Sequence, residues 1–144
     1  MKISTKGLYG LRAIMDLAIH SKGELVALKH IAERQEISDA YLEQVFSSLR
    51  KAGLVKSQKG SQGGYLLGKA MKDITVGNVL LVLEGELFPY DENANNNLID
   101  QLLIEEVWQA MNRSIAQVVD SLTLEDLVNH YLILEQENDP MFYI

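Results

Sequence analysis

The chain has 144 residues, which is enough for one domain with a sizeable core or for a small domain with an appendage. It contains no cysteine, and this excludes disulfides, thiolate-ligated metal or iron–sulfur centres and a thiol switch. No apolar run approaches the roughly 20 residues of a membrane span, and the N-terminus lacks the apolar core of a signal peptide. We therefore expect a cytoplasmic protein with no membrane partner.

The net charge of −7 is divided unevenly along the chain. Residues 1–72 carry 12 Lys+Arg and 6 Asp+Glu, a balance of +6, whereas residues 73–144 carry 1 and 14, a balance of −13. A basic half favours a polyanionic partner such as nucleic acid, and an acidic half repels one. The alternative is that basic and acidic faces only neutralise each other, and charge alone leaves both interpretations open.

The spacing of apolar residues predicts three helices in the basic half. The first begins at the capping residues Ser4 or Thr5 and runs to about residue 20, and the second covers about residues 28–35. The third is capped by Ser38 and stopped by Gly53. It has a core stripe at helical spacing, formed by Leu42, Val45, Phe46 and Leu49. Two helices joined by a short turn, the second with a polar outer face, are typical of a helix-turn-helix.

Residues 54–67 predict a β-hairpin. Residues 54–58 alternate as a strand does, the glycine-rich stretch KGSQGG forms the tip, and residues 65–67 form the return strand. Glycine permits the positive φ values that a tight reversal needs. A recognition helix followed by such a hairpin predicts a winged helix.

The acidic half predicts further helices. Thr75 begins a short helix that Gly85 ends, residues 88–97 form a loop, residues 98–122 form the longest helix, and a last helix runs from Thr123 to about residue 134. The predicted fold is therefore mainly α with a small β-wing. It divides into a winged helix-turn-helix domain (1–88), a flexible loop (89–97), a dimerisation helix (98–122) and a C-terminal helix with an acidic tail (123–144).

The longest helix has a nearly continuous apolar seam. A helix that is apolar on more than one side needs a second partner besides its own core, and closed two-fold dimers are the commonest oligomers. We predict a homodimer whose contacts come from Leu102, Trp108, Met111, Ile115, Val118 and Leu122. The alternative is a helix that packs wholly within one chain.

Polar groups on the third helix, the wing and the N-terminus predict contact with double-stranded DNA. Helix side chains can read base edges, lysines can reach phosphates, and Lys59 beside the wing glycines can enter a minor groove. The free N–H groups at the start of the first helix can bind phosphate. Glu43 could accept from a cytosine amino group or pair with Arg50 or Lys51. The candidate DNA-binding residues are Lys2, Ser4, Thr5, Lys6, Ser38, Tyr41, Glu43, Gln44, Ser48, Lys51, Lys59 and Gly60.

No group of residues in the sequence points to catalysis. The histidines His20, His30 and His130 are scattered, and adjacent acids such as Glu105 and Glu106 do not face each other on a helix. The wing glycines match neither a phosphate-binding loop nor a dinucleotide fingerprint, because no helix follows them. We predict no enzymatic activity, no catalytic residues, no metal site and no cofactor.

Three stretches of the chain resemble the Rrf family of bacterial winged-helix regulators: MKISTKGLYGL, SDAYLEQVFSSLRKAGLV and KGSQGGYLL. The resemblance implies a dimeric transcription factor that uses the long helix for dimerisation. Sensing in the family usually falls to three cysteines in the loop before that helix, and this chain has none. The family also often has arginine where this chain has Leu8 and Lys59. Arginine suits a narrow minor groove better than lysine, so the target sequence or affinity can differ.

The cysteine-free loop and the C-terminal stretches LTLEDL and MFYI resemble the CymR branch of the family. This resemblance implies a repressor of cysteine and sulfur metabolism genes, without an iron–sulfur cluster. It also implies control by cysteine synthase, whose active site would take the tail residues Met141, Phe142, Tyr143 and Ile144. The alternatives are a tail that is free or folded onto its own subunit, a protein-interaction module that uses the fold as a scaffold, and a family regulator with an unrelated effector.

Overall fold

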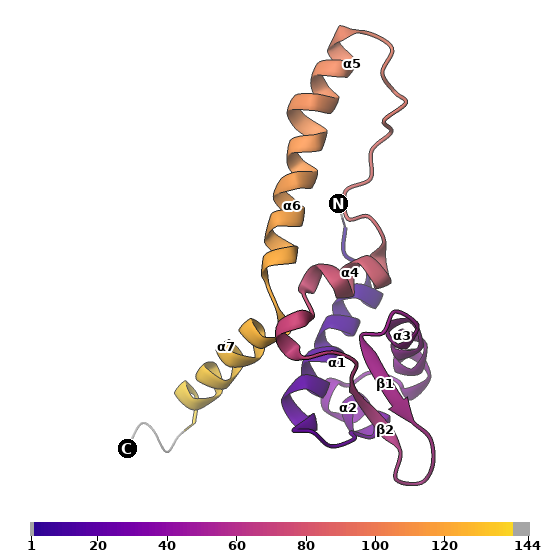
Figure 1. The fold of residues 1–144 in the computed structure, drawn as a ribbon, viewed down its shortest axis with the longest axis vertical. Coiled ribbons are helices and arrows are strands. Elements are labelled where there is room, and N and C mark those ends of the chain that lie inside the picture. The colour runs from indigo at the N-terminus through magenta and orange to yellow at the C-terminus, as the bar shows by residue number, and fades with distance from the viewer. Residues whose placement is uncertain (1, 140–144) are drawn as a thin grey trace.

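Three helices and a hairpin form the N-terminal body of the computed structural model, which describes residues 2–139 (Figure 1). Its elements are α1 (Thr5–Ser21), α2 (Leu28–Gln35), α3 (Asp39–Lys51), β1 (Val55–Gln58) and β2 (Gly64–Leu67). A 3₁₀ turn (Met71–Asp73), which the sequence did not predict, leads to α4 (Val76–Glu84). The body confirms the predicted winged helix-turn-helix.

Local capping explains where the recognition helix α3 begins and ends. The Ser38 hydroxyl accepts a hydrogen bond from the Tyr41 amide at 3.2 Å and so satisfies a donor that the helix leaves free. At the other end Gly53 has a φ of 78°, a left-handed conformation that glycine adopts without steric cost. Both residues act as the sequence predicts.

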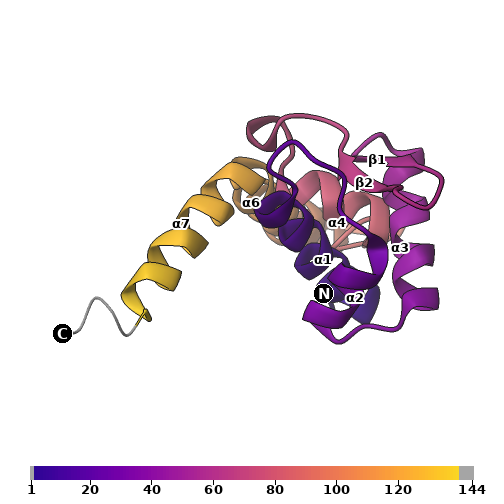
Figure 2. The ribbon, with the colours of Figure 1, turned by 90° about the horizontal axis from the view of Figure 1, so that it is seen from below.

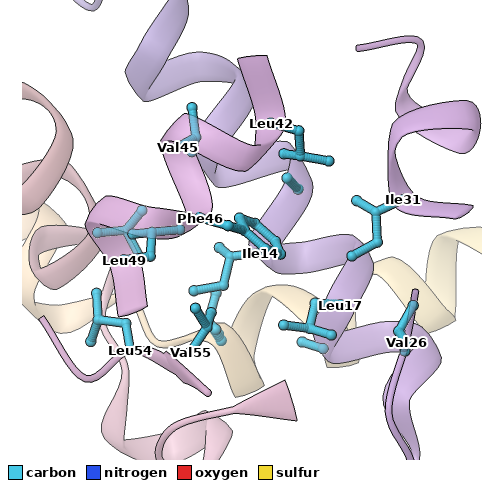
Figure 3. Packing of buried hydrophobic residues seen from close by; sticks show 14 of the residues in the cluster. Ile14, Leu17, Val26, Ile31, Leu42, Val45, Phe46, Leu49, Leu54 and Val55 are labelled. Atoms are coloured by element: carbon cyan, nitrogen blue, oxygen red, sulfur yellow. The ribbon is translucent and has the colours of Figure 1, made fainter. Parts of the chain in front are cut away.

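The core of the body lies where α1, α2, α3 and the wing meet. Leu42, Val45, Phe46 and Leu49, the predicted stripe of α3, are all buried. They pack with Ile14 of α1 and other apolar residues around the Phe46 ring (Figure 3). Complete burial of an apolar side chain contributes about 1.5–3 kcal/mol, so this cluster holds the recognition helix in one orientation.

The wing is attached to the body by backbone and aromatic contacts. β1 and β2 pair antiparallel, with Val55 opposite Leu67. Val26, in the segment between α1 and α2, exchanges two backbone hydrogen bonds with Tyr65, at 3.0 Å and 2.8 Å. The Tyr65 ring lies edge-on to Phe46, with centroids 4.9 Å apart. The hairpin therefore extends from a fixed base.

Residues 98–121 form a helical rod that extends away from the body (Figure 1). The sequence predicted one helix over residues 98–122. The structure instead has α5 (Leu98–Leu103), a π-helical segment (Ile104–Trp108) and α6 (Gln109–Ser121). The wider π turn changes the angular spacing of side chains. Helical structure nevertheless runs without a gap from Leu98 to Ser121.

The last helix, α7 (Leu124–Glu137), returns to the body and then projects from it (Figure 2). Leu124 and Val128 are buried in the core, whereas the second half of the helix is exposed. Thr75 and Thr123 each form a capping box, and their backbones lie side by side as a β-bridge. Next to this bridge, the Val76 amide donates to the Leu122 carbonyl oxygen at 2.8 Å. Among residues 2–139, no helix is both long enough and apolar enough to span a membrane.

Candidate DNA interface

The outer face of α3 and the wing enclose two polar concave surfaces. The wing cleft, about 620 Å³, lies between the wing and the first residues of α2 and α3. It is lined by Ala27, Leu28, Lys29, Asp39, Glu43, Arg50, Ser57, Gln58, Lys59, Gly60, Ser61, Gly63, Gly64 and Tyr65. The helix cleft, about 550 Å³, is lined by Ala40, Glu43, Gln44, Ser47, Ser48, Arg50, Lys51 and Tyr65. The two clefts have Glu43, Arg50 and Tyr65 in common, so α3 and the wing together form one shared polar surface.

Most of the α3 residues that the sequence predicts for DNA line these two clefts. Glu43, Gln44 and Lys51 are exposed, so their polar groups are available to a ligand. The Ser48 hydroxyl lies 3.4 Å from Gln44 O, to which it donates within the helix. No ion pair links Glu43 to Arg50 or Lys51 in the part of the chain that the structure describes. The Glu43 carboxylate therefore keeps its acceptor capacity.

Residues of α1 support the Tyr41 side chain through a series of contacts. Its ring lies edge-on to that of Tyr9, with centroids 6.1 Å apart. The Arg12 guanidinium lies 5.2 Å from the centroid of the Tyr9 ring and donates to the Gln35 carbonyl oxygen at 2.6 Å. A cation at the C-terminal end of α2 is favourable for the helix dipole. Tyr41 itself lines neither cleft, and these contacts fix its half-buried side chain in the first turn of α3.

A buried carboxylate joins α1 to the helix-turn-helix. Asp16 is 2% exposed and receives hydrogen bonds from the Arg34 Nη2, at 2.7 Å, and from the Gln35 Nε2, at 2.8 Å. The hydrogen bond to Asp16 raises the pKa of Arg34, so the guanidinium stays charged. This network therefore fastens the end of α2, the first helix of the helix-turn-helix, to α1.

Lys59 and Gly60 lie at the exposed tip of the wing, where the sequence predicts a minor-groove contact. Gly60 has a φ of 116°, a conformation that side chains rarely adopt. Gly64 lies directly against Val26, where a side chain would collide with the carbonyl group. These two glycines allow the narrow hairpin to form and to lie close to the body.

The start of α1 differs from the sequence prediction. Its amide groups were expected to be free for phosphate, but the Glu84 Oε1 accepts from Ser4 N at 2.8 Å, Ser4 Oγ at 2.6 Å and Gly7 N at 3.0 Å. The hydrogen bond from the Ser4 hydroxyl lowers the pKa of Glu84. Glu84 therefore occupies the amides of Ser4 and Gly7, and a phosphate contact at this end remains a prediction for the amides of Thr5 and Lys6 and for the side chains of Lys2, Thr5 and Lys6.

Arg50 and Tyr65, which line both clefts, and Glu84, which caps α1, are not among the residues that the sequence predicts for the site. Arg50 lies seven residues after Glu43, on the same helical face, and this spacing could have identified it. Tyr65 also lines both clefts. Glu84 carried no local signal, because its partner Ser4 is 80 residues away in the chain.

The predicted dimer seam is largely uncovered within one chain. Leu102 and Val118 are each 58% exposed, Met111 is 41% exposed and Leu122 is 37% exposed, whereas Trp108 and Ile115 are half-buried. Trp108 packs against Phe88, with ring centroids 6.1 Å apart. The predicted tail site, Met141, Phe142, Tyr143 and Ile144, lies outside the described residues.

Comparison with known proteins identifies relatives along the whole chain. Residues 3–130 match the Rrf2 family model, described as an iron-dependent transcriptional regulator. The chain is 44% identical over 145 residues to the transcriptional regulator CymR of Bacillus subtilis, covering 100% of both proteins. It is 39% identical to IscR of Yersinia enterocolitica, covering 96% of this chain and 88% of that protein.

Solved structures of regulators have the same fold. The structure of CymR, the global cysteine regulator of B. subtilis, superimposes with a TM-score of 0.79 at 41% identity and covers 90% of this chain and 98% of that one. IscR of T. potens superimposes with a TM-score of 0.75 at 42% identity and covers 100% of this chain and 97% of that one.

The residues of this chain do not fit the iron that the family description names. The sequence has no cysteine. Within residues 2–139, no group of three or more His, Asp or Glu side chains is placed to hold a metal ion. We therefore assign no step to iron.

The helix-turn-helix, the wing and the shared polar surface agree with what the relatives are named for, which is transcriptional regulation and not enzymatic catalysis. The chain belongs to the Rrf2 family of transcriptional regulators.

Proposed function

We propose that the chain is a homodimeric repressor that reads a palindromic operator and controls genes of cysteine and sulfur metabolism, in the cytoplasm and without an iron–sulfur cluster. The observation that carries the DNA-reading part is the shared surface of α3 and the wing, which gathers Gln44, Lys51, Lys59 and Gly60. A helix in the major groove and a hairpin in the minor groove fit this arrangement.

The homodimer is supported by the leucines and valines that the rod exposes. Isolated exposed apolar residues are normal, but a contiguous row is typical of an interface. In a two-fold dimer each subunit would present one α3 to one half-site. The proposed contacts are Leu102, Trp108, Met111, Ile115, Val118 and Leu122.

The sulfur-metabolism role is supported by the full-length similarity to CymR, which is named as a global cysteine regulator in B. subtilis. The further proposal is that cysteine synthase binds the tail residues Met141 to Ile144 and tunes repression. A chain without cysteine needs a sensor other than a thiol or a thiolate-held cluster.

The DNA-reading proposal is tested by replacing Tyr41 and Lys59 together with alanine. Operator affinity should fall on the order of 100-fold, because each base contact contributes about 1–3 kcal/mol. Duplexes selected from genomic DNA by the purified wild type serve as the ligand, and fluorescence anisotropy measures binding. The matched control replaces Tyr131 and Arg113, one tyrosine and one cation outside the two clefts. Unchanged operator binding by a folded Tyr41/Lys59 variant would refute the proposal.

The tail proposal is tested by deleting residues 141–144. The truncated protein should bind the operator as the wild type does but should no longer bind purified cysteine synthase in a pull-down or in calorimetry. If the synthase binds both forms equally, the tail is not its docking site. If it binds neither form, the protein has a different effector.

A further inference from the structure

Arg50 occupies the boundary between the recognition helix and the wing. It lies in the last turn of α3, and its Nη1 donates to the Ser57 hydroxyl of β1 at 3.4 Å. Of residues 2–139, only Glu43, Arg50 and Tyr65 line both the wing cleft and the helix cleft. Of these three, Arg50 alone carries a positive charge.

The position of Arg50 has a direct consequence for bound DNA. If α3 enters the major groove and the wing enters the adjacent minor groove, the sugar–phosphate backbone of one strand must pass between them. The surface that separates the two clefts is the part of the protein that faces this strand. Arg50 and its partner Ser57 are exposed there, as is Glu43, the acidic residue that lines both clefts.

The guanidinium of Arg50 is chemically suited to a phosphate. Its planar set of N–H donors matches phosphate oxygens in a bidentate geometry, and its charge does not titrate. No carboxylate forms an ion pair with it among residues 2–139. The hydroxyl of Ser57 holds one nitrogen and leaves other donors of the fork available.

We propose that Arg50, positioned by Ser57, binds a backbone phosphate of the DNA strand that runs between the two grooves. This inference rests on the proposed DNA-reading function and adds a phosphate site to it. The site is distinct from the predicted phosphate contacts of Lys51 and of the start of α1. It fixes the depth at which helix and wing enter their grooves and carries no base preference.

The test compares Arg50→Met, Arg50→Lys and the wild type on the selected operator and on an unrelated duplex over a range of salt concentrations. Methionine keeps most of the apolar stem and removes the charge. Arg50→Met should weaken binding to both duplexes by the same factor, about tenfold, which is the size expected for one charged hydrogen bond. The slope of log affinity against log salt should fall by about 0.9, the value for one phosphate.

Two controls separate this site from general effects. Arg113→Met removes one positive charge from α6 and should leave the salt slope unchanged. Arg50→Lys should retain the slope but lose part of the affinity, because a lysine cannot form the bidentate contact.

A chemical change in the DNA identifies the phosphate. Operators with one neutral methylphosphonate at successive positions are titrated with both proteins. At the contacted position the neutral group should weaken the wild type about tenfold and should add nothing to the loss in Arg50→Met, because the two changes remove the same interaction.

The outcomes distinguish this inference from the function on which it rests. If the wild type shows no salt-dependent DNA binding, the proposed function fails. If the wild type binds but Arg50→Met keeps its salt slope, the phosphate site is refuted. A loss confined to the operator, with unrelated duplexes unaffected, would mean that Arg50 reads a base and would equally refute it.

Discussion

Glu84 ends one helix and caps another. Its carboxylate lies at the C-terminal end of α4, where the helix dipole disfavours a negative charge, and at the N-terminal end of α1, where the dipole favours it. The three hydrogen bonds from Ser4 and Gly7 decide the balance, and they lower the pKa of Glu84. Gly7 belongs to the same arrangement, because a side chain there would collide with the carboxylate. A single residue thus links α4 to the first turn of α1.

Replacing Glu84 with glutamine should make part of the stability independent of pH. A carboxyl group whose pKa is lowered by folding contributes stability above its unfolded pKa, which is near the ordinary value of 4.5. It loses that contribution as the pH falls through the folded pKa. At pH 7 the variant should be less stable by about 0.3–1 kcal/mol, and the difference should shrink as the pH falls through the folded pKa.

Urea unfolding at a series of pH values from 7 downward measures this difference. The control is Glu86→Gln, at an exposed glutamate two residues further along the chain. A stability gap for the Glu84 variant that stays the same as the pH is lowered would contradict the assignment.

At the scale of elements, the wing depends on its contact with the segment between α1 and α2. The Val26 to Tyr65 hydrogen bonds add a third short extended segment to the two-stranded sheet. A two-stranded hairpin by itself is only marginally stable in water. The edge-on packing of Tyr65 against Phe46 connects the same strand to the core. The wing is therefore oriented by the body and not by its own hairpin.

The variant Gly64→Ala should release this contact. A Cβ at residue 64 would lie 2.5 Å from the Val26 carbonyl oxygen and 3.1 Å from the Ala27 amide nitrogen, so the backbone must shift. Overpacking of this kind costs about 1–3 kcal/mol. The loss in free energy of DNA binding should exceed the loss in free energy of unfolding, because the wing changes its angle to α3.

Hydrogen exchange of the Tyr65 amide reports the release directly, alongside thermal unfolding and operator binding. Asn95→Ala, at an exposed position of the loop before α5 and outside both clefts, is the control and should leave all three unchanged. Retained protection at Tyr65 in Gly64→Ala would show that the contact tolerates a side chain.

At the scale of the whole molecule, one chain leaves a large apolar surface uncovered. Leu98 and Ile99 at the far end of the rod are 81% and 70% exposed, and Leu81 of α4 is 64% exposed. The rod rises from the body instead of folding onto it (Figure 1). Both facts favour association through this element, since burying apolar area drives most protein–protein contacts.

Replacing Met111 and Val118 with glutamate should dissociate the proposed dimer. The two residues lie seven positions apart on one face of α6. Each uncompensated buried charge costs about 3–5 kcal/mol, so the dimer dissociation constant should rise by at least about 100-fold. Sedimentation velocity gives the mass, and binding to a palindromic operator should weaken in parallel.

Gln117→Glu adds a charge to the same helix away from this face and should leave the dimer intact. A dimer that persists in the Met111/Val118 variant would place the interface elsewhere. A monomeric wild type would exclude the dimer.

The sequence by itself determined the elements whose causes are local. The Ser38 cap, the apolar stripe from Leu42 to Leu49 and the stop at Gly53 each depend on residues within one or two turns, so the pattern predicts α3 correctly. The glycine-rich hairpin and the family resemblance follow from short stretches in the same way. The DNA-contact and dimer residues inferred from these patterns remain predictions.

Only the tertiary structure decided which surfaces meet. The contacts of Glu84 with Ser4 and of Val26 with Tyr65 join residues far apart in the chain, and no local periodicity encodes them. The π-helical segment Ile104–Trp108 interrupts the regular α-helical spacing, and the sequence pattern did not predict it. Arg50 lies between the two clefts because the wing packs beside the end of α3, where Ser57 of β1 accepts its hydrogen bond. Side-chain spacing describes one helix at a time, whereas an interface depends on the packing that brings separate elements together.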